Sequence, residues 1–344
     1  MSSKLDKLTR RDFLKLAATV TGGGIVGGAF VRYRNLWQQP STRVMTLKAV
    51  SYKHDLVDLM RRGVQNFPSI LQRIKGNRVV LKPNLVEYYG ERCVNTNPLF
   101  VAAAIETFRS LGAGEVIVAE GPGHRRDMEL LLEASGLQDV LYQEKVNFVD
   151  LNLDSIAPVQ LKENYTQLGA LFLPKTILGA DLVISMPKLK THHWAGVTLS
   201  LKNMFGTVPG VKYGWPKNAL HWCGIDNSIV DINLAVKPDF AIVDGIDGMQ
   251  GDGPLYGETV HAGVIVMGDN LTAVDATAAR IMGIYPEHIP HLLMMQRHGG
   301  TVHASRISQI GEPVSAVQQD FSVLSYWDFV KQPLPFIRKL FLIN

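Results

Sequence analysis

Three lysines in one segment are the residues of this sequence best suited to bind a charged molecule. Lys188, Lys190 and Lys202 lie within PKLKTHHWAGVTLSLKNMFG, residues 187–206. Amine groups gathered in this way can neutralise a phosphate or a carboxylate. The segment therefore predicts an anion-binding site. The alternative is a basic loop whose lysines are simply solvated.

Neutral polar residues in and before this segment could orient such an anion. Thr191 and Asn203 each follow one of the lysines, and Lys82 and Asn84 occur in the earlier motif KPN. If residues 194–205 form an α-helix, its N-terminal amides would add partial positive charge to the site.

Three titratable residues are candidates for moving a proton in a reaction: His192, Glu120 and Asp244. His192 stands beside lysines, and nearby positive charge keeps an imidazole neutral near pH 7. A neutral imidazole can then act as a general acid or base. A histidine that only forms structural hydrogen bonds is the alternative.

A metal site is a second hypothesis for the carboxylates. One histidine could combine with Glu120, Asp244 or Asp275, which belong to separate parts of the chain. The adjacent His192 and His193 are a poor chelating pair, because neighbouring side chains point to opposite faces of a strand or about 100° apart on a helix. Asp275 is also a candidate for binding substrate, or an acid near the start of its own helix.

The segment DGIDGMQGDGP, residues 244–254, combines three aspartates with four glycines. Glycines let a backbone approach a ligand closely. We expect a flexible or ligand-cradling loop here, with a plain connection of several turns as the alternative. The spacing does not match a calcium-binding EF-hand.

The elements that must position these residues alternate along the chain. Short β-branched runs are separated by segments with helical periodicity, which predicts an α/β protein with a mostly parallel β-sheet flanked by helices. Residues 151–175 are expected to form a small β-rich insertion, and residues 205–225 a long loop. The expected strands are 78–81, 115–119, 147–151, 181–185, 240–243 and 263–267, and the expected helices include 98–111, 127–134 and 271–282.

Polar residues follow five of the expected strands. They are Lys82, Glu120, Lys188, Asp244 and the segment 268–270. In open parallel sheets, ligands bind beyond the carboxyl ends of the strands. We therefore expect all five strand ends to meet at one edge of the sheet and to form one site.

The N-terminal string TRRDFLK, residues 9–15, precedes a glycine-rich uncharged stretch and resembles a twin-arginine export signal. That stretch is short for a bilayer span of about 20 residues, so cleavage and retention as an anchor both stay open. We expect residues 1–34 to be this signal or anchor, 43–330 a single α/β domain and 331–344 an apolar tail. Export would place the protein in the periplasm or another extracytoplasmic compartment, with the twin-arginine translocase as a partner.

Composition excludes several classes of protein. The 344 residues are 46% hydrophobic and 19% charged, which suits a sizeable core and excludes disorder. Residues 1–29 carry five basic and two acidic groups, so they hold +3 of the net +4, and the remaining +1 does not indicate nucleic-acid binding. The two cysteines, Cys93 and Cys223, are too few for an intrinsic iron–sulfur cluster or a disulfide scaffold, and their spacing does not show whether they pair.

Four motifs in this order resemble the domain-of-unknown-function family 362. They are KPN at 82–84, PKLKTH at 187–192 with KNMFG at 202–206, DGIDGMQGDGP at 244–254 and GDNLTAVDATAARIMG at 268–283. Many members of that family are described as iron–sulfur-associated and carry a ferredoxin-like cysteine motif. This chain lacks the motif, so the resemblance implies a shared site and leaves the reaction open.

These observations predict an exported protein that acts as an enzyme on a small phosphorylated or carboxylated molecule at the carboxyl edge of the sheet. Lys188, Lys190 and Lys202 would neutralise the anion, and Asn84 and Asn203 would orient it. A second hypothesis is a non-catalytic binding or maturation factor that accompanies an exported redox (iron–sulfur) partner. A third is a ligand-sensing domain tethered to the membrane.

Overall fold

The computed structural model describes residues 42–90, 92–123 and 127–333. These described residues belong to one compact unit. The expected signal or anchor over 1–34 and residues 334–344 of the expected tail lie outside the described residues.

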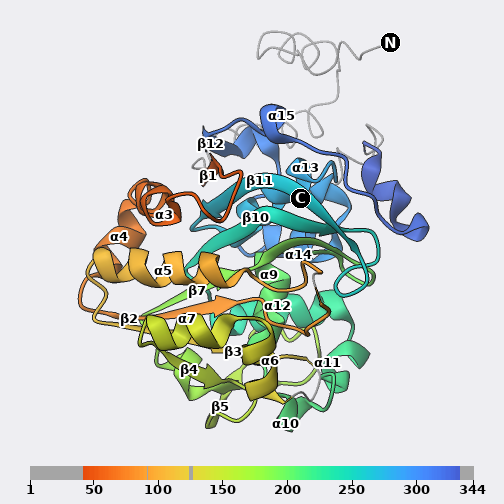
Figure 1. The fold of residues 1–344 in the computed structure, drawn as a ribbon. Helices are drawn as coiled ribbons and strands as arrows, with labels where there is room; N and C mark the ends of the chain where they lie inside the picture. The colour runs from red at the N-terminus through yellow and green to blue at the C-terminus, as the bar shows by residue number, and fades with distance from the viewer. Residues whose placement is uncertain (1–41, 91, 124–126, 334–344) are drawn as a thin grey trace, which may run out of the picture. The chain divides into compact units, whose positions relative to one another are not determined.

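Within the described ranges, ten strands form one sheet (Figure 1). Its main order is β12-β1-β11-β10-β7-β2-β3-β4, while β8 pairs with β10 and β9 pairs with β8. The strands are β1 (Thr42–Lys48), β2 (Arg78–Pro83), β3 (Glu115–Glu120), β4 (Asn147–Asp150), β7 (Leu182–Met186), β8 (Lys188–His192), β9 (Gly196–Thr198), β10 (Phe240–Gln250), β11 (Glu258–Gly268) and β12 (Ile307–Gly311).

Neighbouring strands from β10 to β4 run parallel, and so do β1 and β12. The antiparallel pairs in the sheet are β1 with β11, β10 with β11, and β8 with β9. A separate antiparallel hairpin of β5 (Ile156–Gln160) and β6 (Ala170–Pro174) forms the expected β-rich insertion. The predicted α/β class with a mostly parallel sheet is therefore confirmed.

Helices cover both faces of the sheet, and a separate hydrophobic core lies on each. One core joins alternate strand residues such as Val79 and Leu81 to Phe100 of α5. The other joins Val80 to Leu201 of α9. On the first face lie α3 (Leu56–Val64), α4 (Pro68–Ile74), α5 (Pro98–Ser110), α6 (Met128–Ala134) and α7 (Leu137–Gln143), and on the second α9 (Ser200–Asn203), α12 (Ile225–Val236), α13 (Leu271–Ile281) and α14 (Pro290–Gln296).

Helices α5 and α13 begin at side-chain caps. The Asn97 side chain accepts a hydrogen bond from the Leu99 amide, and proline follows at the first helical position of α5. The Asn270 side chain likewise accepts from the Ala273 amide at the start of α13. Within the described chain, no helix is both long and apolar enough to cross a membrane.

The lysine-rich segment differs from its expected conformation. Residues 188–192 are strand β8 rather than a loop, and 196–198 are β9, which begins at Gly196 with φ +75°. The condition of a helix over 194–205 is therefore not met. Helix α9 begins only at Ser200 and continues as the 3₁₀ turn η2 (Met204–Thr207).

Three further expectations need correction. Residues 244–250 belong to β10 rather than to a flexible loop, because they pair with β8 and β11. The expected loop over 205–225 contains two short helices, α10 (Gly210–Tyr213) and α11 (Asn218–Trp222). Strand β11 is antiparallel to β10, and its last residue, Gly268, pairs with Ala241 near the start of β10. Segment 268–270 therefore lies at the opposite edge from the other four strand ends.

Candidate functional site

A cavity of about 320 Å³ lies beyond the carboxyl ends of β2 and β3, and we call it the lysine cavity. This is where ligands bind in open α/β sheets. Its wall comes from the ends of β2 and β3, from β8 to α9, from α11 and from the turn after β10. The lining residues are Lys82, residues 84–86, 120–123, Lys190, residues 192–194, Thr198, Lys202, Asn203, Phe205, Gly206, Pro216, Lys217, His221 and residues 254–256.

A buried ion pair lies at the base of this cavity. Lys82 Nζ is 2.5 Å from Glu120 Oε2, and both side chains are almost completely buried. Glu120 also accepts hydrogen bonds from the Leu85 and Gly121 amides, at 3.2 and 2.8 Å. Burial lowers the pKa of Lys82, and the charge of Glu120 opposes this effect. Glu120 is thus held by three donors and neutralises one lysine of the cavity.

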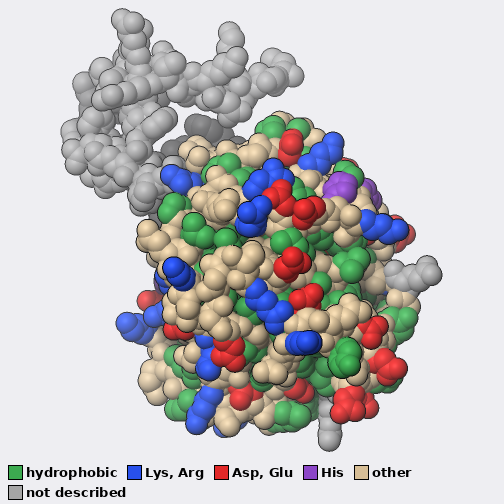
Figure 2. Space-filling model, turned by 60° about the vertical axis from the view of Figure 1, so that its left-hand side comes forward, with side chains coloured by type: hydrophobic (Ala, Val, Ile, Leu, Met, Phe, Trp, Pro, Cys, Tyr) green, Lys and Arg blue, Asp and Glu red, His purple; other side chains and the backbone are tan. Residues whose placement is uncertain are grey.

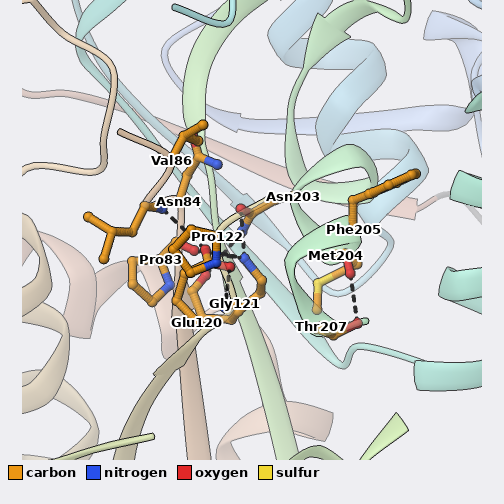
Figure 3. Close-up of polar contacts among 12 residues, drawn as sticks. Pro83, Asn84, Val86, Glu120, Gly121, Pro122, Asn203, Met204, Phe205 and Thr207 are labelled. Carbon is orange, nitrogen blue, oxygen red and sulfur yellow. Dashed lines mark hydrogen bonds and ion pairs between the residues drawn. The ribbon is translucent and has the colours of Figure 1, made fainter. Parts of the chain in front are cut away.

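Asn203 positions this ion pair. Its amide nitrogen donates to the Lys82 carbonyl at 3.0 Å and to the Ser185 hydroxyl at 3.1 Å, and its Oδ1 accepts from Lys82 Nζ at 3.1 Å. In Figure 3 the Asn203 side chain points toward the end of β3, where Glu120 and Gly121 lie. Asn203 therefore orients Lys82, and its amide group is largely occupied by the protein itself.

Two further lysines are fully buried at the cavity and pair only with carbonyl oxygens among the described residues. Lys190 Nζ donates to the Val94 carbonyl at 2.8 Å. Lys217 Nζ donates to the carbonyls of Gly121 and Phe205 at 2.7 and 3.1 Å. Burial lowers the pKa of each to about 7. Near neutral pH these amines can both bind an anion and exchange a proton.

A fourth lysine, Lys202, is partly buried, and its Nζ lies 4.2 Å from the centre of the Phe205 ring. Burial and then the charge of Lys82 lower its pKa to about 8. Three amines of the cavity therefore have no carboxylate partner in the described chain, namely those of Lys190, Lys202 and Lys217. Such an excess of positive charge suits an anionic ligand.

His192 is neutral in this environment. Its Nδ1 accepts hydrogen bonds from the amides of Trp194 and Ala195, at 3.0 and 3.2 Å. Burial, followed by the charges of nearby basic groups, lowers the pKa of His192 well below its usual value. The ring proton must therefore sit on Nε2. Because Nδ1 is already occupied, His192 is suited to donate a hydrogen bond and unsuited to take up or release a proton.

Two buried oxygen atoms at the cavity have no hydrogen-bond partner among the residues that the structure describes. They are Asn84 Oδ1 and Thr198 Oγ1, and the side chains are 7% and 4% exposed. An unpaired buried polar atom costs free energy, so such atoms call for an explanation. Both lie where a ligand would supply the missing partner.

Lys188 and Asp244 lie outside this cavity. They are paired across the parallel strands β8 and β10, with Lys188 Nζ 2.8 Å from Asp244 Oδ2. The Tyr52 hydroxyl bridges both at 2.7 and 2.9 Å. Burial would lower the pKa of Lys188, but Asp244 and neighbouring groups raise it above its usual value. This network is therefore an internally neutralised pair that joins the two strands.

Two other candidate residues also serve the fold. The Thr191 hydroxyl donates to the Gly251 carbonyl at 2.9 Å, on the face of β8 opposite to Lys190 and His192. Asp275 accepts from the Ser200 hydroxyl and from the Ser200 and Leu201 amides, so it caps α9 from a neighbouring helix. Burial raises the pKa of Asp275 to about 6, and these hydrogen bonds oppose the rise.

The hypothetical metal set of one histidine with Glu120, Asp244 or Asp275 is not assembled, since each carboxylate is engaged in a different network. No group of three or more His, Cys, Asp or Glu side chains in the described ranges could hold a metal ion. Cys93 and Cys223 are free thiols.

The sequence did not indicate Lys217, because it lies in the segment read as a loop. The signal available was a lysine flanked by apolar residues, Trp215 and Pro216 before it and Ala219 and Leu220 after it. Such a lysine is expected to have its charge near a partner or a ligand rather than in bulk water.

Comparisons with known proteins place the chain among its relatives. The model of the family described as Domain of unknown function (DUF362) matches residues 79–280. The chain belongs to this family. The DUF362 region contains every residue that lines the lysine cavity.

A relative and a solved structure share part of this DUF362 chain. The Thylakoid-associated protein sll1697 of Synechocystis sp. is 30% identical over 233 residues, which are 65% of this chain and 68% of that protein. The structure of the lactate racemase apoprotein from Thermoanaerobacterium thermosaccharolyticum matches with a TM-score of 0.41 and 14% identity, over 70% of this chain and 57% of the racemase chain.

Proposed function

We propose that this protein is an enzyme that binds a small phosphorylated or carboxylated molecule in the lysine cavity. The observation that carries the proposal is the unequal charge of the cavity. Lys190, Lys202 and Lys217 have no carboxylate partner among the described residues, whereas Glu120 neutralises only Lys82. An anionic ligand would supply the missing negative charge.

The geometry also supports a division of roles. His192 donates a hydrogen bond from Nε2 to a substrate oxygen and thereby polarises it. The amines of Lys190 and Lys217, with pKa values of about 7, are suited to move a proton near neutral pH. Glu120 holds Lys82 in place rather than meeting the substrate directly.

The test measures thermal stabilisation by phosphate, oxalate, citrate and nucleotides, comparing wild type with Lys202→Met. This substitution keeps the aliphatic stem and removes an amine whose loss leaves no hydrogen-bond acceptor unpaired. One charge-assisted contact is worth about 1.5–3 kcal/mol, so anion affinity should fall roughly 10- to 100-fold with little change in unfolding. Lys175→Met removes an exposed lysine of helix α8 (Lys175–Leu178) and is the matched control.

The proposal fails if no anion stabilises the wild type. It fails equally if Lys202→Met responds to anions as the wild type does. Lys188→Met is unsuitable as a probe, because it would leave Asp244 buried without its cation.

We also propose export by the twin-arginine route, supported by the TRRDFLK string at 9–15. The name of the Synechocystis relative associates that protein with thylakoids, which supports a place at or across a membrane. A binding or maturation role beside an exported redox partner stays the second candidate. This second candidate predicts that the protein binds a redox protein and converts no small anion.

A further inference from the structure

Lys202 differs from the other lysines of the cavity because its amine has nothing to bind. Lys82, Lys190 and Lys217 each donate to a carboxylate or carbonyl oxygen. Lys202 Nζ forms no hydrogen bond or ion pair with any residue in the described ranges, and only the Phe205 ring lies beneath it. An amine that the fold does not use is available to a ligand.

The surroundings of Lys202 raise the fraction of its amine that is neutral and has a free lone pair. Burial and the charge of Lys82 both disfavour its protonated form, and its pKa falls to about 8. An apolar wall or a neighbouring cation is the means by which proteins turn a lysine into a nucleophile. Lys202 is partly buried and lies near such a cation, Lys82.

The rest of the cavity fits a small molecule with an acidic group and a carbonyl group. Lys190 and Lys217 supply two cations for a carboxylate. His192 supplies an Nε2 donor for a carbonyl oxygen. Asn84 Oδ1 and Thr198 Oγ1 are acceptors without a partner in the described ranges, and they suit the hydroxyl group formed when an amine adds to a carbonyl.

We propose that Lys202 attacks the carbonyl carbon of a small oxo acid bound in the lysine cavity and forms an imine with it. This inference rests on the proposed function, because the carboxylate of the oxo acid is the anion that the other lysines bind. It adds a covalent step and a substrate class to that function.

The step balances without an oxidant or a reductant. The Nζ lone pair forms the C–N bond, and the carbonyl π electrons move to oxygen. A proton passes from the nitrogen to this oxygen through a neighbouring amine, Lys190 or Lys217. A second proton transfer releases the hydroxyl group as water and leaves the C=N bond.

The experiment traps the imine. The full chain is incubated at about pH 7 with pyruvate and sodium cyanoborohydride, and the adducts are located by intact mass and peptide mapping. Burial lowers the pKa of Lys202 to about 8, against about 10.4 for an ordinary lysine, so near pH 7 its neutral fraction is more than about a hundredfold larger than that of an exposed lysine. A less basic amine is also a weaker nucleophile, which offsets part of the larger neutral fraction. We therefore expect Lys202 to be labelled at least about tenfold faster than Lys175.

Two comparisons make the result specific. Oxalate carries carboxylates but no ketone, so it should compete for the cavity and suppress labelling of Lys202 while leaving Lys175 unaffected. Lys202→Arg keeps the charge but cannot form the imine, so it should retain stabilisation by oxalate and lose the cavity adduct. If this variant does not fold, oxalate protection of the wild type is the deciding measurement.

Labelling of Lys202 no faster than Lys175, or labelling that oxalate does not suppress, would overturn the inference. If oxalate still stabilises the wild type in that case, imine formation fails and anion binding stands. If oxalate and the other anions have no effect at all, the proposed function fails as well.

Discussion

Four lysine amines and a single carboxylate face the lysine cavity among the described residues, and their partners differ. Lys82 is tied to Glu120, whereas Lys190 and Lys217 donate to carbonyl oxygens and Lys202 donates to nothing described. The free energy of protonating the amine therefore differs from one lysine to the next. This difference makes pH a direct probe of the site.

We expect stability and anion binding to depend on pH with opposite signs. Lys190 and Lys217 have pKa values of about 7 and Lys202 about 8 in the folded protein, against about 10.4 in an unfolded chain. Between these values the unfolded chain binds more protons, so stability without ligand should rise with pH. Stabilisation by oxalate needs protonated amines and should fall over the same window.

The measurement is the melting temperature from about pH 6 to 9, with and without oxalate, whose own charge is constant there. Lys202→Met should reduce the rise of the ligand-free melting temperature at the upper end of this pH range. Stabilisation by oxalate that stays unchanged from pH 6 to 9 would show that these amines do not bind it.

The side chains of the site were easier to predict from the sequence than their roles. Lys82, Asn84, Glu120, Lys190 and His192 do meet in one cavity. The role of His192 depends on two backbone amides that donate to Nδ1. The turn between β8 and β9 brings these amides to the ring, and no local sequence pattern indicates that turn.

At the scale of elements, the central strands were predictable because β-branched residues buried on both faces leave a strong pattern. Strand β8 was not, since its polar residues favour a loop locally and its conformation depends on pairing with β9 and β10. The antiparallel direction of β11 also escaped prediction. It follows from the tight connection after β10, and it moves residues 268–270 away from the site.

The turn after α9 gives a prediction at this scale. Gly206 lies against the buried ion pair, and a Cβ there would lie 1.9 Å from Glu120 Oε1 and 2.6 Å from Lys82 Nζ. Gly206→Ala should therefore separate this pair. Breaking a buried ion pair typically costs about 3–5 kcal/mol, which urea unfolding would detect.

Gly123→Ala is the matched control for this substitution. Gly123 also lines the cavity, but a Cβ at this position meets nothing within 4 Å. Its effect on unfolding should stay within about 0.5 kcal/mol. Equal effects of the two substitutions would show that the close approach of Gly206 to the ion pair is unimportant.

At the scale of the whole molecule, the buried positive charge is concentrated at one cavity. On the face drawn in Figure 2, basic and acidic side chains are interspersed. The chain beyond residue 29 carries about +1, although four lysines line one cavity. This arrangement favours a small anion that enters the protein over an extended anionic polymer that binds across it.

The lysine cavity is built from segments between residues 82 and 256, so it exists only once most of the chain has folded. The twin-arginine route carries folded proteins, and it would allow the cavity to form before export. We expect the double substitution Arg10→Lys and Arg11→Lys to leave the protein in the cytoplasm, as measured by cell fractionation. Lys4→Arg with Lys7→Arg keeps the same charge outside the motif and should be exported normally. Export of the Arg10 and Arg11 variant at the wild-type level would contradict this assignment and would make the TRRDFLK string an ordinary pair of arginines.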